Sequence, residues 1–171
     1  MRRRIIFLIL TITWMFIIFS FSAKPAEESA DMSLSVGYTL GKTFVPDFET
    51  WSVEDQEAFA ERIDQPVRKC AHAAEYAVLG LLLAGTVISN GVGRNRSFKQ
   101  KIQGEKLSIV AQYAICFIIG AAYAASDEFH QLFVPGRAGR VTDVLIDSGG
   151  VIFGLFIAFI VSWMKNLKFK R

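Results

Sequence analysis

Charge is missing from four long stretches of the sequence. Residues 5–21 and 107–125 contain no Asp, Glu, Lys or Arg, and residues 70–89 and 144–163 contain one such residue each. Each stretch has about 17 to 20 residues, the length that a helix needs to cross the hydrocarbon core of a bilayer. A spanning backbone must satisfy its own hydrogen bonds, which favours helices. The lack of charge therefore excludes an ordinary soluble domain, and we predict an all-α integral membrane bundle of four transmembrane helices.

Acidic residues are almost missing from three basic segments. Residues 2–4, 94–106 and 165–171 hold three, five and four Lys or Arg, and together they hold a single acid. Basic loops stay in the cytoplasm. We therefore predict that both termini are cytoplasmic, and that residues 22–69 and 126–143 face outward.

Long basic tracts, internal repeats and low-complexity segments are missing as well. The basic clusters are short and flank membrane spans, which excludes nucleic acid as a partner. We predict a transmembrane anchor helix over residues 1–22 and an extracytoplasmic loop with a short helix over residues 23–65. A transmembrane domain over residues 66–164 and a basic cytoplasmic tail over residues 165–171 follow. The predicted location is the cell membrane, as a multi-pass protein.

The first span begins after MRRR, a pattern that also fits a secretory signal peptide. The apolar run is long for a signal, and the small-residue site after it (SFSAKPA) is poorly formed. We therefore favour an uncleaved anchor helix. Cleavage would leave the orientation of the other three spans unchanged.

Cysteine is scarce, because the chain has only two. Cys70 falls near the outer end of the second predicted span, and Cys116 falls in the middle of the third. The predicted topology places them too far apart in depth to form a disulfide. We expect both to be small, buried, apolar side chains.

The segments between the spans contain turn and capping signals. Residues 22–50 mix Ser, Gly, Pro and acids, so we expect an extracytoplasmic loop with little regular structure. Residues 52–64 (SVEDQEAFAERID) predict a short helix with Ser52 as its N-cap. Pro66 predicts a break before the second span. Residues 134–140 (VPGRAGR) predict a turn.

Polar residues recur three or four positions apart on the last three spans, so they share one face of each helix. These residues are Lys69, His72, Glu75 and Tyr76 on the second span, Tyr123, Asp127 and His130 on the third, with Glu128 and Gln131 beside them, and Asp143 and Asp147 on the fourth. The predicted topology puts all three faces at the outer membrane boundary, which predicts a site. Gly150 and Gly154 continue the last face as a small-xxx-small pair that lets another backbone approach closely.

Each of these residues also has a structural interpretation. A charge inside a spanning helix costs roughly 2.5 to 3.5 kcal/mol on insertion scales, so it usually has a partner. The structural ion pairs would join Glu75 to Lys69 or Arg137, and Asp147 to Arg140. The tyrosines at positions 76 and 123 would mark the interfacial aromatic belt.

Two motifs resemble those of a known family. RKxxHxxEYxxLG begins at Arg68, and SDExHQxFVPGRxGxxxDVxxDxxG begins at Ser126. Together they are similar to the VanZ-like family of small bacterial membrane proteins, over about residues 65–160. The family position that is often Asn is Asp147 in this chain. The family takes its name from a protein linked to resistance against glycopeptide antibiotics, notably teicoplanin, so the resemblance implies a fold and a site but no particular reaction.

We predict that the site binds or modifies an amphipathic molecule at the membrane surface. The expected partners are membrane lipids and an envelope lipid-linked precursor or lipoglycopeptide. Imidazoles titrate near neutral pH and suit acid–base roles, and Lys69 and Arg137 suit an anionic group. The candidate catalytic residues are His72, Glu75, Asp127, Glu128, His130 and Asp143. The candidate substrate-binding residues are Lys69, Tyr76, Gln131, Arg137 and Asp147.

Three alternatives stay open from the residues alone. A divalent metal would take His72, Glu75, Glu128 and His130, although their spacing matches no standard zinc signature. A non-enzymatic protein would use the polar cluster to fix the bundle, and its outer loop would bind an antibiotic or a partner protein. A surplus of carboxylates over cations in the cluster favours proton chemistry or metal binding over this structural role. A transporter is the weakest alternative, because four short, unbroken spans leave little room for alternating access.

Overall fold

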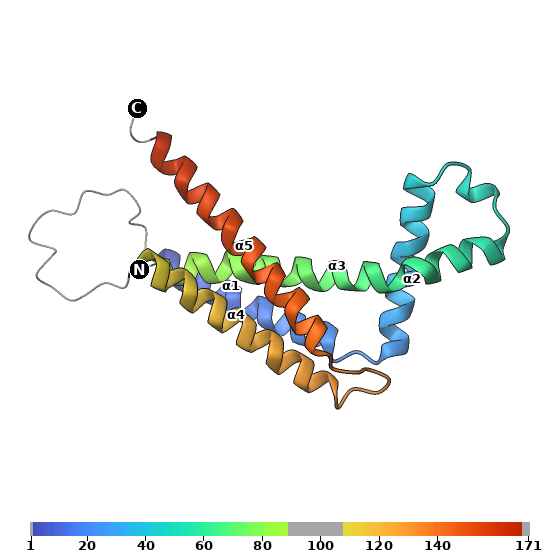
Figure 1. The fold of residues 1–171 in the computed structure, drawn as a ribbon, viewed down its shortest axis with the longest axis horizontal. Coiled ribbons are helices and arrows are strands. Elements are labelled where there is room, and N and C mark those ends of the chain that lie inside the picture. Colours follow the sequence, from blue (N-terminus) through green and yellow to red (C-terminus); the bar gives the residue numbers. More distant parts are fainter. Residues whose placement is uncertain (1, 89–107, 169–171) are drawn as a thin grey trace, which may run out of the picture.

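The computed structural model describes residues 2–88 and 108–168 of the chain. In these residues the elements are α1 (Arg2–Ser22), α2 (Ala26–Phe44), the 3-10 turn η1 (Phe48–Thr50), α3 (Val53–Val87), α4 (Ile109–Gln131) and α5 (Val141–Lys168). No β-strand occurs in the described part, so the all-α prediction is confirmed (Figure 1). The basic loop at residues 94–106 and the tail residues 169–171 lie outside it.

Four of the helices are long and apolar enough to cross a membrane. They are Arg2–Ser22, Val53–Val87, Ile109–Gln131 and Val141–Lys165. These helices coincide with the four charge-poor stretches of the sequence over most of their length, so the predicted set of spans is confirmed. The chain is a multi-pass helical membrane protein.

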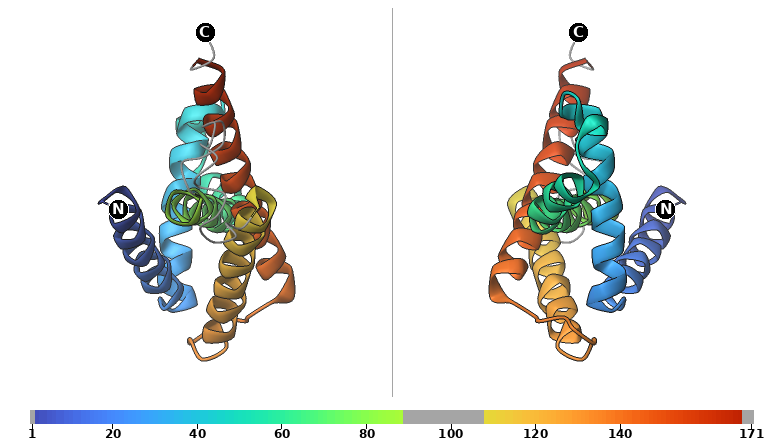
Figure 2. Two further views of the ribbon diagram at one scale, coloured as in Figure 1. Left: turned by 90° about the vertical axis from the view of Figure 1, so that its left-hand side faces the viewer. Right: turned by 90° about the vertical axis from the view of Figure 1, so that its right-hand side faces the viewer.

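The central helix of the bundle is α3, which contacts α1, α2, α4 and α5. Figure 2 shows α3 between the other spans when the bundle is viewed along its length. Apolar side chains from all four spans form the core, among them Ile18, Leu79, Cys116 and Val151. This arrangement lets α3 present its polar face to α4 and α5 at one end of the bundle.

Glycines bring α3 and α5 into close contact. A Cβ atom added at Gly150 would lie 2.3 Å from the Ala73 carbonyl oxygen, and one at Gly154 would lie 2.0 Å from the Ala77 carbonyl oxygen. Across the same contact, a Cβ at Gly80 would lie 2.5 Å from the Val151 oxygen. The close backbone approach expected from the small-xxx-small pair is therefore confirmed, and α3 supplies a glycine of its own.

The expected loop after the first span is wrong, because residues 26–44 form α2. Ser33, Gly37 and Gly41 are buried on one face of this helix. A Cβ at Gly37 would lie 3.2 Å from Ala60 of α3, so a small residue is required there. Glycine and serine lower helix propensity, and here tertiary packing overrides propensity. Figure 1 shows α2 crossing the end of the bundle at a steep angle to α3.

The expected break at Pro66 is also wrong, because α3 continues through it as one helix of 35 residues. Proline removes one hydrogen bond from a helix but is tolerated when packing holds the chain on both sides. At 1.5 Å per residue the helix is about 52 Å long, well beyond a hydrocarbon core of about 30 Å. Part of α3 therefore extends past the hydrocarbon core. The predicted cap is confirmed, since Ser52 Oγ accepts from the Asp55 N–H at 3.1 Å.

The turn and the cysteines agree in part with expectation. Residues 132–140 form the turn between α4 and α5, and Gly136 has a φ of +73°, a backbone region that favours glycine. Both cysteines are free thiols. Cys116 is buried as expected, whereas Cys70 is exposed, which corrects the expectation for that residue.

Candidate functional site

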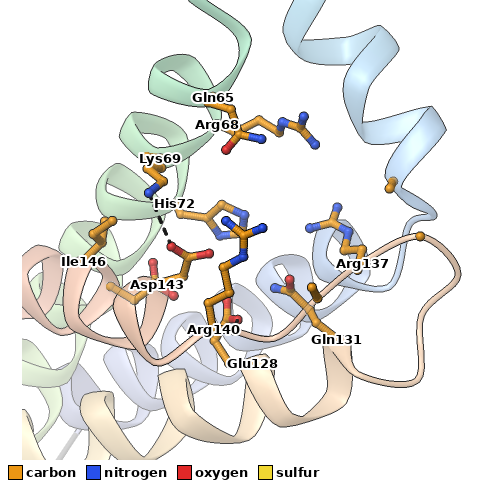
Figure 3. Close-up of a pocket in the computed structure, with 14 residues that line it drawn as sticks. Gln65, Arg68, Lys69, His72, Glu128, Gln131, Arg137, Arg140, Asp143 and Ile146 are labelled. Atoms are coloured by element: carbon orange, nitrogen blue, oxygen red, sulfur yellow. Dashed lines mark hydrogen bonds and ion pairs between the residues drawn. The ribbon is translucent and has the colours of Figure 1, made fainter.

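A cavity of about 160 Å³ lies where α3, α4, α5 and the α4–α5 loop meet (Figure 3). It is at the end of the bundle that α2 crosses, and we call it the polar cavity. It is lined by seven of the residues predicted for the site: Lys69, His72, Glu128, Gln131, Arg137, Asp143 and Asp147. Predicted site residues from three helices and one loop therefore line a common cavity.

Basic side chains outnumber acidic ones in this lining. Arg68 and Lys69 come from α3, and Arg137 and Arg140 come from the loop. The acids that line it are Glu128, Asp143 and Asp147. The carboxylate surplus counted along the sequence is therefore not a property of the cavity. Sequence reasoning left Arg68 and Arg140 out of the site, although both lie within the two motifs.

Two of the four cations are paired with carboxylates. Arg68 pairs with Asp64 one helical turn earlier, and Lys69 Nζ lies 3.7 Å from Asp143 Oδ1 (Figure 3). The expected structural pairs of Glu75 with Lys69 or Arg137, and of Asp147 with Arg140, are not formed. The structural interpretation of the cluster therefore loses the contacts on which it depended.

Arg137 is held by backbone carbonyls instead of a carboxylate. Its Nε donates to the Lys24 oxygen at 2.9 Å, and its Nη2 donates to the Phe21 oxygen at 3.3 Å. These bonds tie the α4–α5 loop to the end of α1 and fix the guanidinium at the cavity. Burial and the neighbouring Arg68 lower the pKa of Arg137. A bound anion would offset both effects, because it supplies the missing opposite charge.

Glu128 holds the end of the α4–α5 loop next to the polar cavity. Its Oε2 accepts a hydrogen bond from the Arg140 backbone N–H at 2.9 Å. The side chain of Arg140 extends into the cavity together with His72 (Figure 3).

Two arginines at the cavity have no acidic ion-pair partner in the described part of the chain. Within residues 2–88 and 108–168, neither Arg137 nor Arg140 forms an ion pair. Their positive charges are therefore available to a ligand.

Two aspartates are buried without hydrogen-bond partners. Asp127 is 2% exposed and Asp147 is 1% exposed, and none of their four carboxylate oxygens has a partner among the described residues. The donors close to Asp127 are those of Ser22, Tyr76 and Gln131. A buried polar group without a partner costs about 1–3 kcal/mol, and more when charged. Such a cost is typical of groups retained for function rather than for stability.

The two site tyrosines lie inside the bundle. Tyr76 is completely buried, and its hydroxyl has no hydrogen-bond partner in the described part of the chain. Tyr123 is half-buried and donates to the Met15 carbonyl oxygen at 2.6 Å. The aromatic-belt interpretation is therefore wrong for Tyr76, which packs in the core.

A second cavity of about 190 Å³ adjoins the first, and we call it the amphipathic cavity. Arg68, His72 and Arg137 line both cavities. The remaining lining comes from the end of α1, from α2 and from α3, and includes Glu75. Glu75 therefore lines the second cavity and not the first.

Comparison with known proteins identifies the family. Residues 7–162 match the family described as VanZ/LLP1. The chain belongs to the VanZ/LLP1 family. The match extends from α1 to α5, and so it takes in α1 and α2 as well as the two motifs. No curated protein and no solved structure matches the chain.

The two histidines of this VanZ/LLP1 chain occupy different surroundings. His72 lines both cavities, with Asp127 and Asp143 as its acidic neighbours. His130 packs its ring against Phe19 of α1, with the ring centroids 4.5 Å apart, and is not part of either cavity lining. The sequence predicted that His130 shares the polar face of its helix, whereas in the structure it lies against α1. A paired acid–base role for the two imidazoles is therefore not supported.

The four ligands of the metal alternative do not meet in the described part of this VanZ/LLP1 chain. Within the described residues, no group of three or more His, Cys, Asp and Glu side chains is placed to hold a metal ion. The proposed ligands are divided, because Glu128 lies in the polar cavity, Glu75 in the amphipathic cavity and His130 against α1. The chemistry that the geometry offers is anion binding beside one imidazole.

Proposed function

We propose that this VanZ/LLP1 protein binds the anionic head group of a cell-envelope lipid in its polar cavity. The observation that carries the proposal is that Arg137 and Arg140 form no ion pair within the described residues and lie at a cavity between membrane-spanning helices. Arginine binds phosphate and carboxylate groups in bidentate fashion. A lipid presents such a group at the depth of this cavity, where hydrocarbon meets water.

The orientation in the membrane follows from charge. The Arg2–Arg4 end of α1 and the last turns of α5 lie at the end of the bundle opposite α2 and the α4–α5 loop (Figure 1). The positive-inside rule favours placing the basic end in the cytoplasm. Under this orientation the polar cavity opens to the extracytoplasmic side, where lipid-linked envelope precursors and lipoglycopeptides are found.

The mixed lining suits a head group that carries hydroxyls besides its anion. The carboxylates of Asp143 and Asp147 accept hydrogen bonds from hydroxyl donors, while the arginines take the anion. His72 has Asp127 and Arg137 among its charged neighbours, and its imidazole can take or give a proton during a modification of the head group. A contribution to glycopeptide resistance would follow if the bound molecule is the lipid-linked target or the lipoglycopeptide itself.

Binding of phosphatidylglycerol will test the proposal. We expect the protein in nanodiscs to bind this anionic lipid more tightly than zwitterionic phosphatidylcholine. Arg137→Gln removes a hydrogen bond to a charged group, worth about 1.5–3 kcal/mol, and so weakens binding roughly 10- to 100-fold. Radiolabelled lipid or native mass spectrometry measures the affinity.

Lys42→Gln is the matched control for Arg137→Gln. It removes one positive charge from an exposed pair with Glu49, remote from both cavities, and should leave lipid affinity unchanged. Equal binding of the two lipids, or equal affinity of Arg137→Gln and wild type, would refute the head-group proposal.

Cysteine labelling will test the orientation. In a Cys70→Ser background, Ala138→Cys in the α4–α5 loop should react with an impermeant maleimide added outside intact cells. Lys165→Cys at the far end of α5 should react only after the membrane is opened. The opposite pattern would place the polar cavity on the cytoplasmic side.

A further inference from the structure

Three side chains form a common wall between the two cavities. Arg68, His72 and Arg137 line the polar cavity on one side and the amphipathic cavity on the other. Two of the three carry a permanent positive charge. A single anionic group placed at this wall is therefore within reach of both cavities.

The two cavities differ in chemistry beyond the wall. The polar cavity continues to the carboxylates of Glu128, Asp143 and Asp147. The amphipathic cavity has the polar side chains of Lys24, Ser29, Ser33 and Glu75 and also the apolar side chains of Phe21, Met32, Val36 and Val67. From the first cavity through the wall to the second, the lining changes from mixed charged groups, through the arginines of the wall, to a mixed surface with apolar side chains on α2. This order matches the head group, phosphate and chain of a lipid.

The apolar end of the second cavity opens at the surface of the protein. Met32 is 45% exposed and Val36 is 47% exposed, and both lie on α2, which crosses the end of the bundle (Figure 1). An apolar cavity of about 150 Å³ is known to hold a benzene-sized molecule. The amphipathic cavity, at about 190 Å³, therefore accommodates the first few methylenes of a chain. The remainder of the chain would continue past α2 into the bilayer.

Hydrogen bonds connect α2 to Arg68 of the common wall and to the α4–α5 loop. The Ser33 hydroxyl on α2 donates to Asp64, and Asp64 also accepts from Arg68 of the wall. The Ala26 N–H at the start of α2 donates to the Pro135 oxygen of the α4–α5 loop at 3.1 Å. Packing and hydrogen bonds thus hold the apolar side chains of α2 in register with the arginines.

We infer that one lipid occupies both cavities, with its phosphate at the wall of Arg68, His72 and Arg137 and the start of its apolar chain against α2. The inference rests on the proposed function and deepens it, because it names the ligand class as a phosphate-bearing amphiphile. The α2 helix is then part of the binding site and not only a connection between the first two spans.

Alkyl phosphates of increasing length test the inference against inorganic phosphate. We expect the affinity of the wild-type protein to rise from ethyl to hexyl phosphate by about fourfold per methylene, as each is buried in the amphipathic cavity. Val36→Trp fills this cavity, so the ratio of hexyl phosphate affinity to inorganic phosphate affinity should fall close to one. Isothermal titration calorimetry of the purified protein in detergent supplies both affinities.

Leu40→Trp is the matched control, since it adds the same ring one turn further along α2, outside the lining of the amphipathic cavity. It should keep the wild-type chain-length dependence. Met32→Trp, which also fills the cavity, replaces Val36→Trp if the latter unfolds, and thermal unfolding of every variant identifies such a case.

The possible outcomes separate the two proposals. If phosphate binds but chain length has no effect, or if Val36→Trp and Leu40→Trp behave alike, the shared-ligand inference is overturned and the head-group proposal stands. If neither inorganic phosphate nor any alkyl phosphate binds, both proposals fail. A chain-length dependence lost only when the cavity is filled supports the inference.

Discussion

Alanine at both Gly150 and Gly154 should disrupt the contact between α3 and α5. The added Cβ atoms would lie 2.3 Å and 2.0 Å from the carbonyl oxygens of Ala73 and Ala77, and these oxygens belong to helix backbone that cannot rotate away. The helices must therefore separate. Overpacking of this kind costs about 1–3 kcal/mol per site. We expect the double variant to lose about 3 kcal/mol or more of unfolding free energy, measured by denaturation in detergent.

Gly149 provides the control within the same helix. A Cβ at Gly149 has nothing within 4 Å, so Gly149→Ala adds a methyl group to open space. Alanine is a better helix former than glycine by about 1 kcal/mol, and Gly149→Ala should match or exceed wild-type stability. If Gly149→Ala and Gly154→Ala destabilise the protein equally, the close backbone contact is not what holds the two helices together.

The spans and this glycine contact were predictable because each depends on a local signal. Apolar runs of bilayer length are recognisable without knowledge of neighbouring elements. The four-residue spacing of Gly150 and Gly154 likewise indicates a close contact, although it does not identify the partner helix. That partner became known only from Gly80 and Ala77 on α3, which are distant in the sequence.

The α2 helix and the continuity of α3 were not predictable from local signals. Gly37 and Gly41 weaken a helix in isolation, and their small size is an advantage only where α2 meets Ala60 and Phe48. Pro66 predicts a break when judged by its neighbours in sequence. In the fold, the packing of α3 against the other helices keeps it continuous. Tertiary contacts decided both cases.

The sequence predicts that polar residues of three helices gather at one level, but only part of the predicted set lines the cavity. Topology places polar residues of three helices at one membrane level, and seven of the predicted residues do line the polar cavity. Small differences in helix rotation decide which side chains enter it, and these sent His130 toward Phe19 and Tyr76 into the core. Arg140 was expected only in a turn and as an ion-pair partner of Asp147, because the hydrogen bond that brings its backbone to Glu128 cannot be read from sequence spacing.

Asp127→Asn should raise the stability of the protein. The carboxylate of Asp127 is buried, and neither oxygen has a hydrogen-bond partner within the described chain. A neutral amide of the same shape avoids the cost of burying an unpaired charge, and the nearby Tyr76 and Ser22 hydroxyls can accept its hydrogen bonds. We expect the unfolding free energy to rise by about 1–3 kcal/mol. Chemical denaturation of the purified variant measures the change.

Asp64→Asn should have the opposite effect on the unfolding free energy. The Asp64 carboxylate accepts from Ser33 and pairs with Arg68, so Asp64→Asn breaks a satisfied network and lowers stability. If Asp127 belonged to a structural network of this kind, its loss would cost about 3–5 kcal/mol. A stability decrease for Asp127→Asn as large as that for Asp64→Asn would therefore favour the structural interpretation of the cluster. An increase shows that Asp127 is retained at a cost to folding, as a residue of a ligand-binding or proton-transfer site would be.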